Sequence, residues 1–291
     1  MRLAIRHETS YSYGDPPLLA LQRLRLGPPT GPALRIHRWD VALSGARAEA
    51  RFTDGHGNRT VLAALERGEI AMRVTVTGMV ETLRDDGVVG DRGDGLPPWL
   101  YRRDTALTAP GARVGRLVEA FDAGDPLASL HGLTRAVRAA IRYRIGETDA
   151  ATTAEDALAH GAGVCQDHAH AFIAAARRAG LPARYVSGYL KMDDRDEQAA
   201  MHAWAEAHVP GLGWVGFDPA NGHSPDARYV AVARGLDYRD AAPVAGLVRN
   251  PAASGTAGSG AAGRRAETLH VAISVSQWQS QQQSQHPSQQ Q

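Results

Sequence analysis

The sequence contains a single cysteine, and its surroundings could make it a nucleophile. Cys165 follows the turn-forming run Gly161-Ala-Gly-Val164, and apolar residues such as Phe172 and Ile173 then recur with helical spacing. A cysteine attacks as its thiolate, which a helix N-terminus and a neighbouring imidazolium both stabilise. An isolated cysteine is more often a small buried apolar residue, so the neighbouring pattern decides the interpretation. That pattern predicts a sulfur beside the unpaired N–H groups of a helix start, which could also hold an oxyanion.

Two predicted strands further along could complete a catalytic triad. In the run from His202 to Val209, alternation puts His202, Trp204 and other polar or aromatic residues on one face and alanines on the other. In the run Trp214-Val-Gly-Phe-Asp218, the two most apolar residues alternate with the carboxylate. If the apolar residues of both strands cover one core, His202 and Asp218 share a face. The carboxylate can then orient the imidazole.

The loop between these strands decides whether that arrangement forms. A four-residue loop over Pro210–Gly213 would pair Asp218 with Ala205 and place the carboxylate on the wrong face. Two glycines in the loop make other geometries accessible. The patterning therefore predicts an odd-length loop or a glycine bulge.

The elements that must position these residues fall into two predicted domains. Residues 1–85 contain period-two runs, such as 34–41 and 71–77, with turn formers at 54–58, and predict a small β-sandwich. Gly, Asp and Pro dominate the linker that follows.

Residues 96–248 form the predicted catalytic domain. Helical periodicity appears around Val114 to Phe121 and Leu133 to Ile141, and Thr152 to Glu155 is a candidate capping box for a third helix. The helix that starts at Cys165 and several antiparallel strands follow, an α+β order.

The C-terminal part is predicted to add little to the core. Residues 249–276 contain a Gly, Ala and Ser-rich flexible segment and one last strand, which could join either domain's sheet. Residues 277–291 are mostly Gln and Ser and are predicted to be disordered.

Composition narrows the possible partners and compartment. Lys+Arg 32 against Asp+Glu 31 leaves a net charge of +1, which gives no electrostatic basis for binding nucleic acid or a membrane surface. The N-terminus lacks the apolar core of a secretory signal, and no apolar run approaches the length of a membrane span. With one cysteine, an internal disulfide is excluded. A cytoplasmic location is predicted. The sequence predicts no cofactor, and it does not predict the oligomeric state.

Three sequence blocks resemble the signature blocks of the bacterial transglutaminase-like family, in the superfamily of papain-like cysteine proteases and transglutaminases. The blocks are Gly163-Val-Cys-Gln-Asp-His-Ala-His170, His202-Ala-Trp204 and Gly213-Trp-Val-Gly-Phe-Asp-Pro-Ala-Asn221. The resemblance implies a papain-like core in which Cys165 is the nucleophile, His202 the general base and acid, and Asp218 the orienting carboxylate. It covers about residues 1–248, with a β region similar to the family's small N-terminal domain, and the final strand.

The match to the family also leaves open points. Leu96-Pro-Pro-Trp-Leu-Tyr101 resembles the family's connecting segment, but Leu236 stands where the family more often has Arg. If that Arg holds a substrate or a carboxylate, another residue must do so here. Asp167 and His168 fit the first block without an assignable role.

Other interpretations compete with the triad. Cys165, His168 and His202 with a carboxylate would make a zinc set, although no short chelating spacing supports it. The alternative for His168 and His170 is helix packing or capping of local carbonyls. Trp204 and Trp214 could line an acyl-donor cleft or belong to the core. The acidic loop from Asp193 to Glu197 is predicted to be a solvated connection.

The function predicted from these residues is acyl transfer through a thioester on Cys165, acting on a peptide or protein substrate. Transfer to water would make the protein a peptidase or amidase, and transfer to an amine a transglutaminase. The resemblance favours hydrolysis of peptide or isopeptide bonds. A non-catalytic binding module on a papain-like fold is the alternative from a different class.

Overall fold

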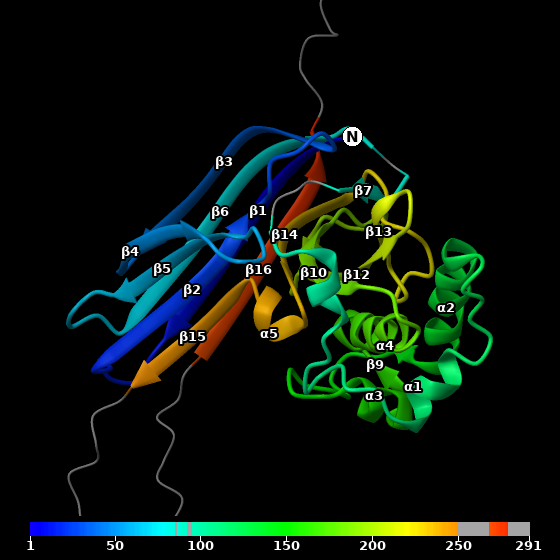
Figure 1. The fold of residues 1–291 in the computed structure, drawn as a ribbon. Helices are drawn as coiled ribbons and strands as arrows, with labels where there is room; N and C mark the ends of the chain where they lie inside the picture. The colour runs from blue at the N-terminus through cyan, green and yellow to red at the C-terminus, as the bar shows by residue number, and fades with distance from the viewer. Residues whose placement is uncertain (85, 92–94, 250–267, 279–291) are drawn as a thin grey trace, which may run out of the picture.

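The structure is a computed structural model that describes residues 1–84, 86–91, 95–249 and 268–278 (Figure 1). A two-layered β region lies on one side of the molecule, and a third sheet covered by helices lies on the other (Figure 1). The α+β fold predicted from the sequence, with helices packed on an antiparallel sheet behind an N-terminal β region, is confirmed.

Two sheets form the β region. Their strand orders are β11-β16-β1-β6-β3 and β15-β2-β5-β4. Alternation is plain in β6, where buried and exposed residues follow one another along the strand. The strands are β1 (Arg2–Ser12), β2 (Leu19–Gly27), β3 (Leu34–Ser44), β4 (Ala46–Thr53), β5 (Arg59–Leu65), β6 (Ala71–Thr82), β11 (Glu197–Gln198), β15 (Val244–Arg249) and β16 (Thr268–Gln277).

Strands from the C-terminal part complete both of these sheets. β16 is the predicted final strand, and it pairs antiparallel with β1 along its whole length. β15, which was not predicted, pairs with β2; its residues 244–248 belong to the predicted catalytic domain, and residue 249 is the first of the predicted flexible segment. Residues 250–267 of that segment and residues 279–291 of the predicted disordered tail lie outside the described residues.

The third sheet has the order β14-β10-β12-β13-β7 and is antiparallel. Its strands are β7 (Val88–Gly90), β10 (Ala183–Leu190), β12 (His202–Val209), β13 (Gly213–Phe217) and β14 (Tyr229–Gly235). Val209 lies opposite Gly213 and Ala205 opposite Phe217, so the turn contains three residues. The predicted odd-length loop is confirmed.

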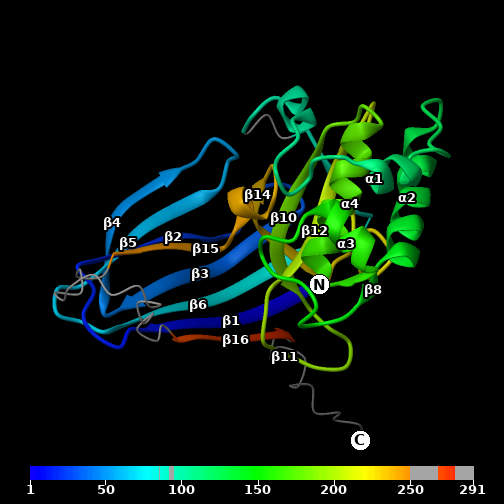
Figure 2. The ribbon, with the colours of Figure 1, turned by 90° about the horizontal axis from the view of Figure 1, so that it is seen from below.

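Helices cover the face of this sheet that carries the alanines of β12 (Figures 1 and 2). They are α1 (Ala112–Leu117), α2 (Pro126–Ala140), α3 (Ala154–His160), α4 (Cys165–Arg178) and α5 (Tyr238–Ala241), with a small parallel pair β8 (Arg142–Tyr143) and β9 (Ala162–Gly163). η1 (Pro98–Arg102) instead places Tyr101 against Trp214 on the other face of the sheet. α4 is nearly all buried because the sheet packs on one side and other helices on the other. Among the described residues, none of the helices is long and apolar enough to cross a bilayer.

The predicted capping box of α3 is wrong by one residue. Thr153, not Thr152, accepts the N–H of Asp156, and its hydroxyl donates back to the carboxylate of Asp156. Glu155 instead accepts N–H groups at the start of α1, including that of Val114 at 2.7 Å. The carboxylate at the predicted box position thus caps a different helix, which spacing alone does not reveal.

Candidate active site

Cys165 is the first residue of α4, as its neighbours predicted, and its side chain is buried at the edge of the core. The preceding Val164 is extended and donates its N–H to Asp167 Oδ2 at 2.7 Å. Thr148 donates its hydroxyl to the same oxygen at 2.7 Å. Asp167, to which sequence reasoning assigned no role, therefore caps the helix that carries the sulfur.

Gly163 makes this cap possible. A Cβ atom at residue 163 would lie 2.5 Å from Asp167 Oδ2, which is closer than real contacts allow. The glycine before Cys165 therefore allows the Asp167 side chain to turn back over the chain.

His202 stands at the first position of β12 and links the two other predicted site residues. Its Nε2 lies 2.6 Å from Asp218 Oδ2, and the ring is near enough to Cys165 for the sulfur to raise the pKa of His202. Nε2 is taken by the carboxylate, which leaves Nδ1 for the sulfur. Burial alone would lower the pKa of His202, but the hydrogen bond to Asp218 and the nearby sulfur of Cys165 outweigh it and raise the pKa to about 10. The ring is therefore an imidazolium at neutral pH.

Asp218 is fully buried and satisfied by neutral donors as well as by the imidazole. Its Oδ2 accepts from Asn221 Nδ2 and from the Tyr229 hydroxyl, each at 2.8 Å, and its Oδ1 accepts the Asn221 N–H at 3.1 Å. Burial raises the pKa of Asp218, yet these hydrogen bonds and His202 bring the pKa below its usual value. The carboxylate is held ionised where it faces the ring.

Sequence reasoning missed Asn221 and Tyr229 as members of this group. Asn221 stood inside the third sequence block, three residues after Asp218, which is the spacing of a local turn in which a side chain bonds nearby backbone. Tyr229 begins β14, which pairs with β10 and not with a strand next to it in the chain. Local sequence spacing gives no signal for such a contact.

The two other histidines of α4 do not approach the sulfur as ligands. Both ring nitrogens of His168 face backbone carbonyls, of Val164 at 2.8 Å and of Ile141 at 2.9 Å. Burial lowers the pKa of His170 to about 3, and its Nε2 accepts the N–H of Tyr238. Packing and capping of local carbonyls is thus the observed role of His168. Among the described residues, no cluster of three or more His, Cys, Asp or Glu could hold a metal ion.

The two tryptophans near the triad are buried core residues. Trp204 packs with Val186 and Tyr229. Trp214 lies under the guanidinium of Arg184, at 3.9 Å from the ring centre. Both support the sheet, and Trp204 also lines a cavity of about 100 Å³ together with Glu206 and Tyr229, which Cys165 does not line. Leu236 is also structural, because its carbonyl accepts from the guanidinium of the buried Arg177 at 2.6 Å.

A second buried charge cluster lies on the same face of β12 as His202. Glu206 accepts from Arg184 of β10 at 2.7 Å and from Arg234 of β14 at 3.2 Å. Burial would raise the pKa of Glu206, but the two guanidinium groups lower it to about 2. Asn58 of the β region donates its Nδ2 to the carbonyl of Arg234 and accepts the N–H of Arg234 at its Oδ1, each at 2.7 Å. The cluster therefore lies where the β region meets the third sheet.

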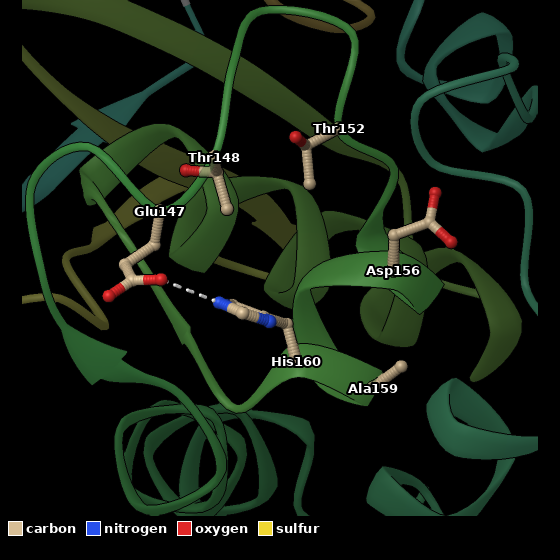
Figure 3. A pocket seen from close by; sticks show the side chains of 6 residues that line it. All are labelled: Glu147, Thr148, Thr152, Asp156, Ala159 and His160. Carbon is tan, nitrogen blue, oxygen red and sulfur yellow. Dashed lines mark hydrogen bonds and ion pairs between the residues drawn. The ribbon is translucent and has the colours of Figure 1, made fainter.

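A pocket of about 450 Å³ opens between α3 and the loop before it (Figure 3). Its wall includes Glu147 and His160, which pair at 3.0 Å, together with Thr148 and Asp156 (Figure 3). None of the three predicted site residues lines it. Its connection to the site is indirect, through the hydroxyl that Thr148 donates to Asp167.

Two family models match this chain, one in the N-terminal β region and one in the part that contains the helices and the third sheet. The bacterial transglutaminase-like N-terminal region matches residues 3–81, and the transglutaminase-like superfamily matches residues 116–219. The second range contains all three residues of the Cys–His–Asp arrangement. The resemblance inferred from the three sequence blocks is confirmed.

Relatives and a solved structure extend the likeness over most of the chain. An uncharacterised protein of Mycobacterium leprae is 29% identical over 266 residues, covering 84% of this chain and 92% of that protein. An uncharacterised protein of Mycobacterium tuberculosis H37Rv is 29% identical over 276 residues, covering 85% and 87%. The crystal structure of a candidate cysteine protease from Cytophaga hutchinsonii has a TM-score of 0.71 at 21% identity, covering 94% of this chain and 90% of that one. It has the same fold.

Proposed function

Because this chain belongs to the bacterial transglutaminase-like family, we propose that it is a cysteine enzyme that transfers or hydrolyses acyl groups through a thioester on Cys165. The observation that carries the proposal is the position of His202, whose ring bonds Asp218 at 2.6 Å and lies near enough to Cys165 for the sulfur to raise the pKa of the ring. An imidazolium between a carboxylate and a sulfur is the arrangement that activates a thiol nucleophile.

The proposed reaction has two steps. The anionic sulfur of Cys165 attacks the carbonyl carbon of an amide, and the imidazolium of His202 gives its proton to the leaving nitrogen as the C–N bond breaks. Water or an amine then attacks the thioester carbon, His202 takes the proton of this nucleophile, and the sulfur leaves. The N–H of Cys165, at the open start of α4, is the proposed first donor to the oxyanion.

Hydrolysis of peptide or isopeptide bonds, with a peptide or protein as substrate, is the form of this reaction that we favour. Water needs no binding site of its own, whereas an amine acceptor does. A cytoplasmic location stays a prediction from the sequence.

Trapping of the thioester tests the proposal directly. The protein is incubated with peptides that contain glutamine or an isopeptide bond, quenched in acid and measured by intact-mass spectrometry, with Cys165→Ala as the control. We expect an added mass on Cys165 in the wild type and none in the variant. Adding a primary amine shows whether water or the amine reacts with the thioester, because an amine acceptor gives an amide product in place of the acid.

Two results together would reject the enzyme and favour the binding module. The first is the absence of an adduct with every peptide. The second is a slow reaction of Cys165 with iodoacetamide that His202→Ala leaves unchanged.

A further inference from the structure

A pocket of about 520 Å³ lies in the β region, where the sheet that ends in β3 faces the sheet that ends in β4. We call these the first and the second sheet. Figure 2 shows the hairpin of β4 and β5 diverging from β3. Pockets that hold one small molecule have volumes of about 300–1,000 Å³. The wall contains apolar residues of both sheets, namely Trp39 and Val41 of the first and Leu24, Leu26 and Val61 of the second.

Trp39 forms a wall of this pocket that is fixed by both sheets. Its indole Nε1 donates to the carbonyl of Leu26, in the second sheet, at 2.9 Å. Its ring lies over Gly78 of the first sheet, where a Cβ atom would come within 2.3 Å of the ring carbons. A glycine inside a strand often marks such a close approach. The aromatic wall is therefore already in place for a ligand.

Two arginines lie on the face of the second sheet that looks into the pocket, and both line it. Arg59 alternates along β5 with Val61, which packs against the core between the sheets, and Arg51 of β4 lies directly opposite Val61. The two arginines therefore share this inner face. A Cβ atom at Gly27 would lie 3.3 Å from Cβ and 3.6 Å from Cδ of Arg59, so the arginine side chain lies across the end of β2.

Both guanidinium groups are available to a ligand. Among the described residues, no acidic side chain pairs with either of them, and both side chains are exposed. The acids nearest to them along the chain are taken, because Glu49 pairs with Arg47 at 2.7 Å and Asp54 with Arg25 at 2.7 Å. The mouth of the pocket therefore carries two positive charges that the protein itself does not neutralise.

The acidic residue of the wall, Asp40, does not cancel these charges. It lies between Trp39 and Val41, whose side chains pack into the core between the sheets. It is also paired with the exposed Thr77 across the ladder with β6. Alternation along β3 thus directs its carboxylate to the outer face of the first sheet.

We propose that this pocket binds a free medium-chain fatty acid, with its carboxylate between Arg51 and Arg59 and its alkyl chain between the two sheets, against Trp39. The forked guanidinium groups match a carboxylate, and the apolar wall matches the chain. The volume suits one small molecule and not a protein surface. The inference is independent of the proposed function, because none of the three residues of the Cys–His–Asp arrangement lines the pocket.

Isothermal titration calorimetry with decanoate, below its micelle concentration, tests the two halves of the ligand separately. We expect the double variant Arg51→Gln/Arg59→Gln to bind decanoate about tenfold more weakly at low salt, because it lacks the charge-assisted hydrogen bonds. Binding of decanol, which has the same chain and no charge, should stay within about twofold of the wild type. Octanoate should bind about tenfold more weakly than decanoate, since it buries two methylene groups fewer.

Two further variants locate the ligand. Thr53 is exposed at the mouth, opposite Arg59, so Thr53→Trp should fill the entrance without disturbing the core and should abolish binding of both decanoate and decanol. Arg38→Gln is the matched control, because Arg38 is exposed on the outer face of β3, opposite Met79. Its affinity for decanoate should equal that of the wild type.

The results that would overturn the proposal are equally definite. No heat of binding with decanoate would mean that the pocket does not take a fatty acid. Equal affinity of the wild type and the double variant for decanoate would mean that the arginines hold no carboxylate. Cys165→Ala should bind decanoate as the wild type does, and a loss of binding in this variant would place the ligand at the nucleophile instead.

Discussion

Two buried carboxylates lie along one face of β12, and they differ in what they leave available. Asp218, which follows β13, binds His202 at the start of β12 and forms what we call the open end, whereas Glu206, four residues along β12 from His202, forms the closed end. At one end Glu206 is closed by two guanidinium groups, from the strands on its far side. At the other end Asp218 is held by neutral donors and one imidazole, and that ring still has a nitrogen for the sulfur. A saturated charge cluster fixes a fold, whereas a partly open one can move a proton.

Removing the charge at the closed end should have the largest effect, on stability. Glu206→Gln leaves Arg184 and Arg234 buried without a counter-charge, and we expect it to lower the free energy of unfolding by about 4 kcal/mol. Urea denaturation followed by tryptophan fluorescence measures this. Glu49→Gln, which breaks an exposed pair with Arg47, is the control and should cost less than about 1 kcal/mol. Equal effects of both variants would show that the cluster is not a structural centre.

Removing the ring at the open end should instead act on reactivity. His202→Ala takes the imidazolium away from the sulfur, and we expect alkylation of Cys165 by iodoacetamide at pH 6 to slow about 100-fold. His208→Ala is the matched control, since His208 lies on the same face of β12 and pairs with Asp91 at 2.9 Å. Because this His–Asp pair is not next to the sulfur, its loss should leave the alkylation rate of Cys165 unchanged. If both variants slow the reaction alike, the effect comes from the strand and not from the triad.

The sequence predicted the His202–Asp218 pair but not the cluster around Glu206, and the reason is physical. Alternation and the odd-length turn put His202 and Asp218 on one face, because side-chain direction follows from local period and loop length. The cluster around Glu206 needs the register of β10 and β14 as well, and Arg184 and Arg234 come from strands 22 and 28 residues away. That register is set by packing of the whole sheet.

The strands of the β region could be predicted from the sequence, but the sheet that each C-terminal strand joins could not. Period-two runs identified its strands, yet nothing in the sequence told which sheet the last strand would join or that residues 244–249 form an edge strand. β15 follows the short helix α5, and β16 follows a long Gly, Ala and Ser-rich segment, so their partners depend on which sheet edge is unpaired. The loop between β10 and β12 is held by one of them, β16, and its place was therefore not visible in the sequence.

The contribution of Glu206 to stability should be lost in acid, and that of His202 should be lost in alkali. The pKa of Glu206 is lowered from 4.5 to about 2, so its contribution is present above pH 4.5 and is lost as the pH falls through 2. The pKa of His202 is raised from 6.5 to about 10, so its contribution is present below pH 6.5 and is lost as the pH rises through 10. We expect each loss to reach about 2 kcal/mol, measured as the pH dependence of urea unfolding. Glu206→Gln should flatten only the acid limb and His202→Ala only the alkaline limb, and a crossed result would contradict the assignment.

The smallest expected effect tests how far the open end depends on its neutral donors. Tyr229→Phe removes the hydroxyl that donates to Asp218 Oδ2 at 2.8 Å and leaves the ring packed against Trp204. A hydrogen bond to a charged group contributes about 1.5 kcal/mol, so we expect alkylation of Cys165 to slow about tenfold at the acid end of its pH profile, with the midpoint of that limb moved to higher pH. The shift follows because Asp218 with one donor fewer protonates more readily and then no longer stabilises the imidazolium. Tyr238→Phe is the control, since its N–H and not its hydroxyl makes the bond to His170. A uniform loss of rate without a shift of the acid limb would mean that Tyr229 only supports packing, and the open end of β12 would then depend on His202 and Asn221 alone.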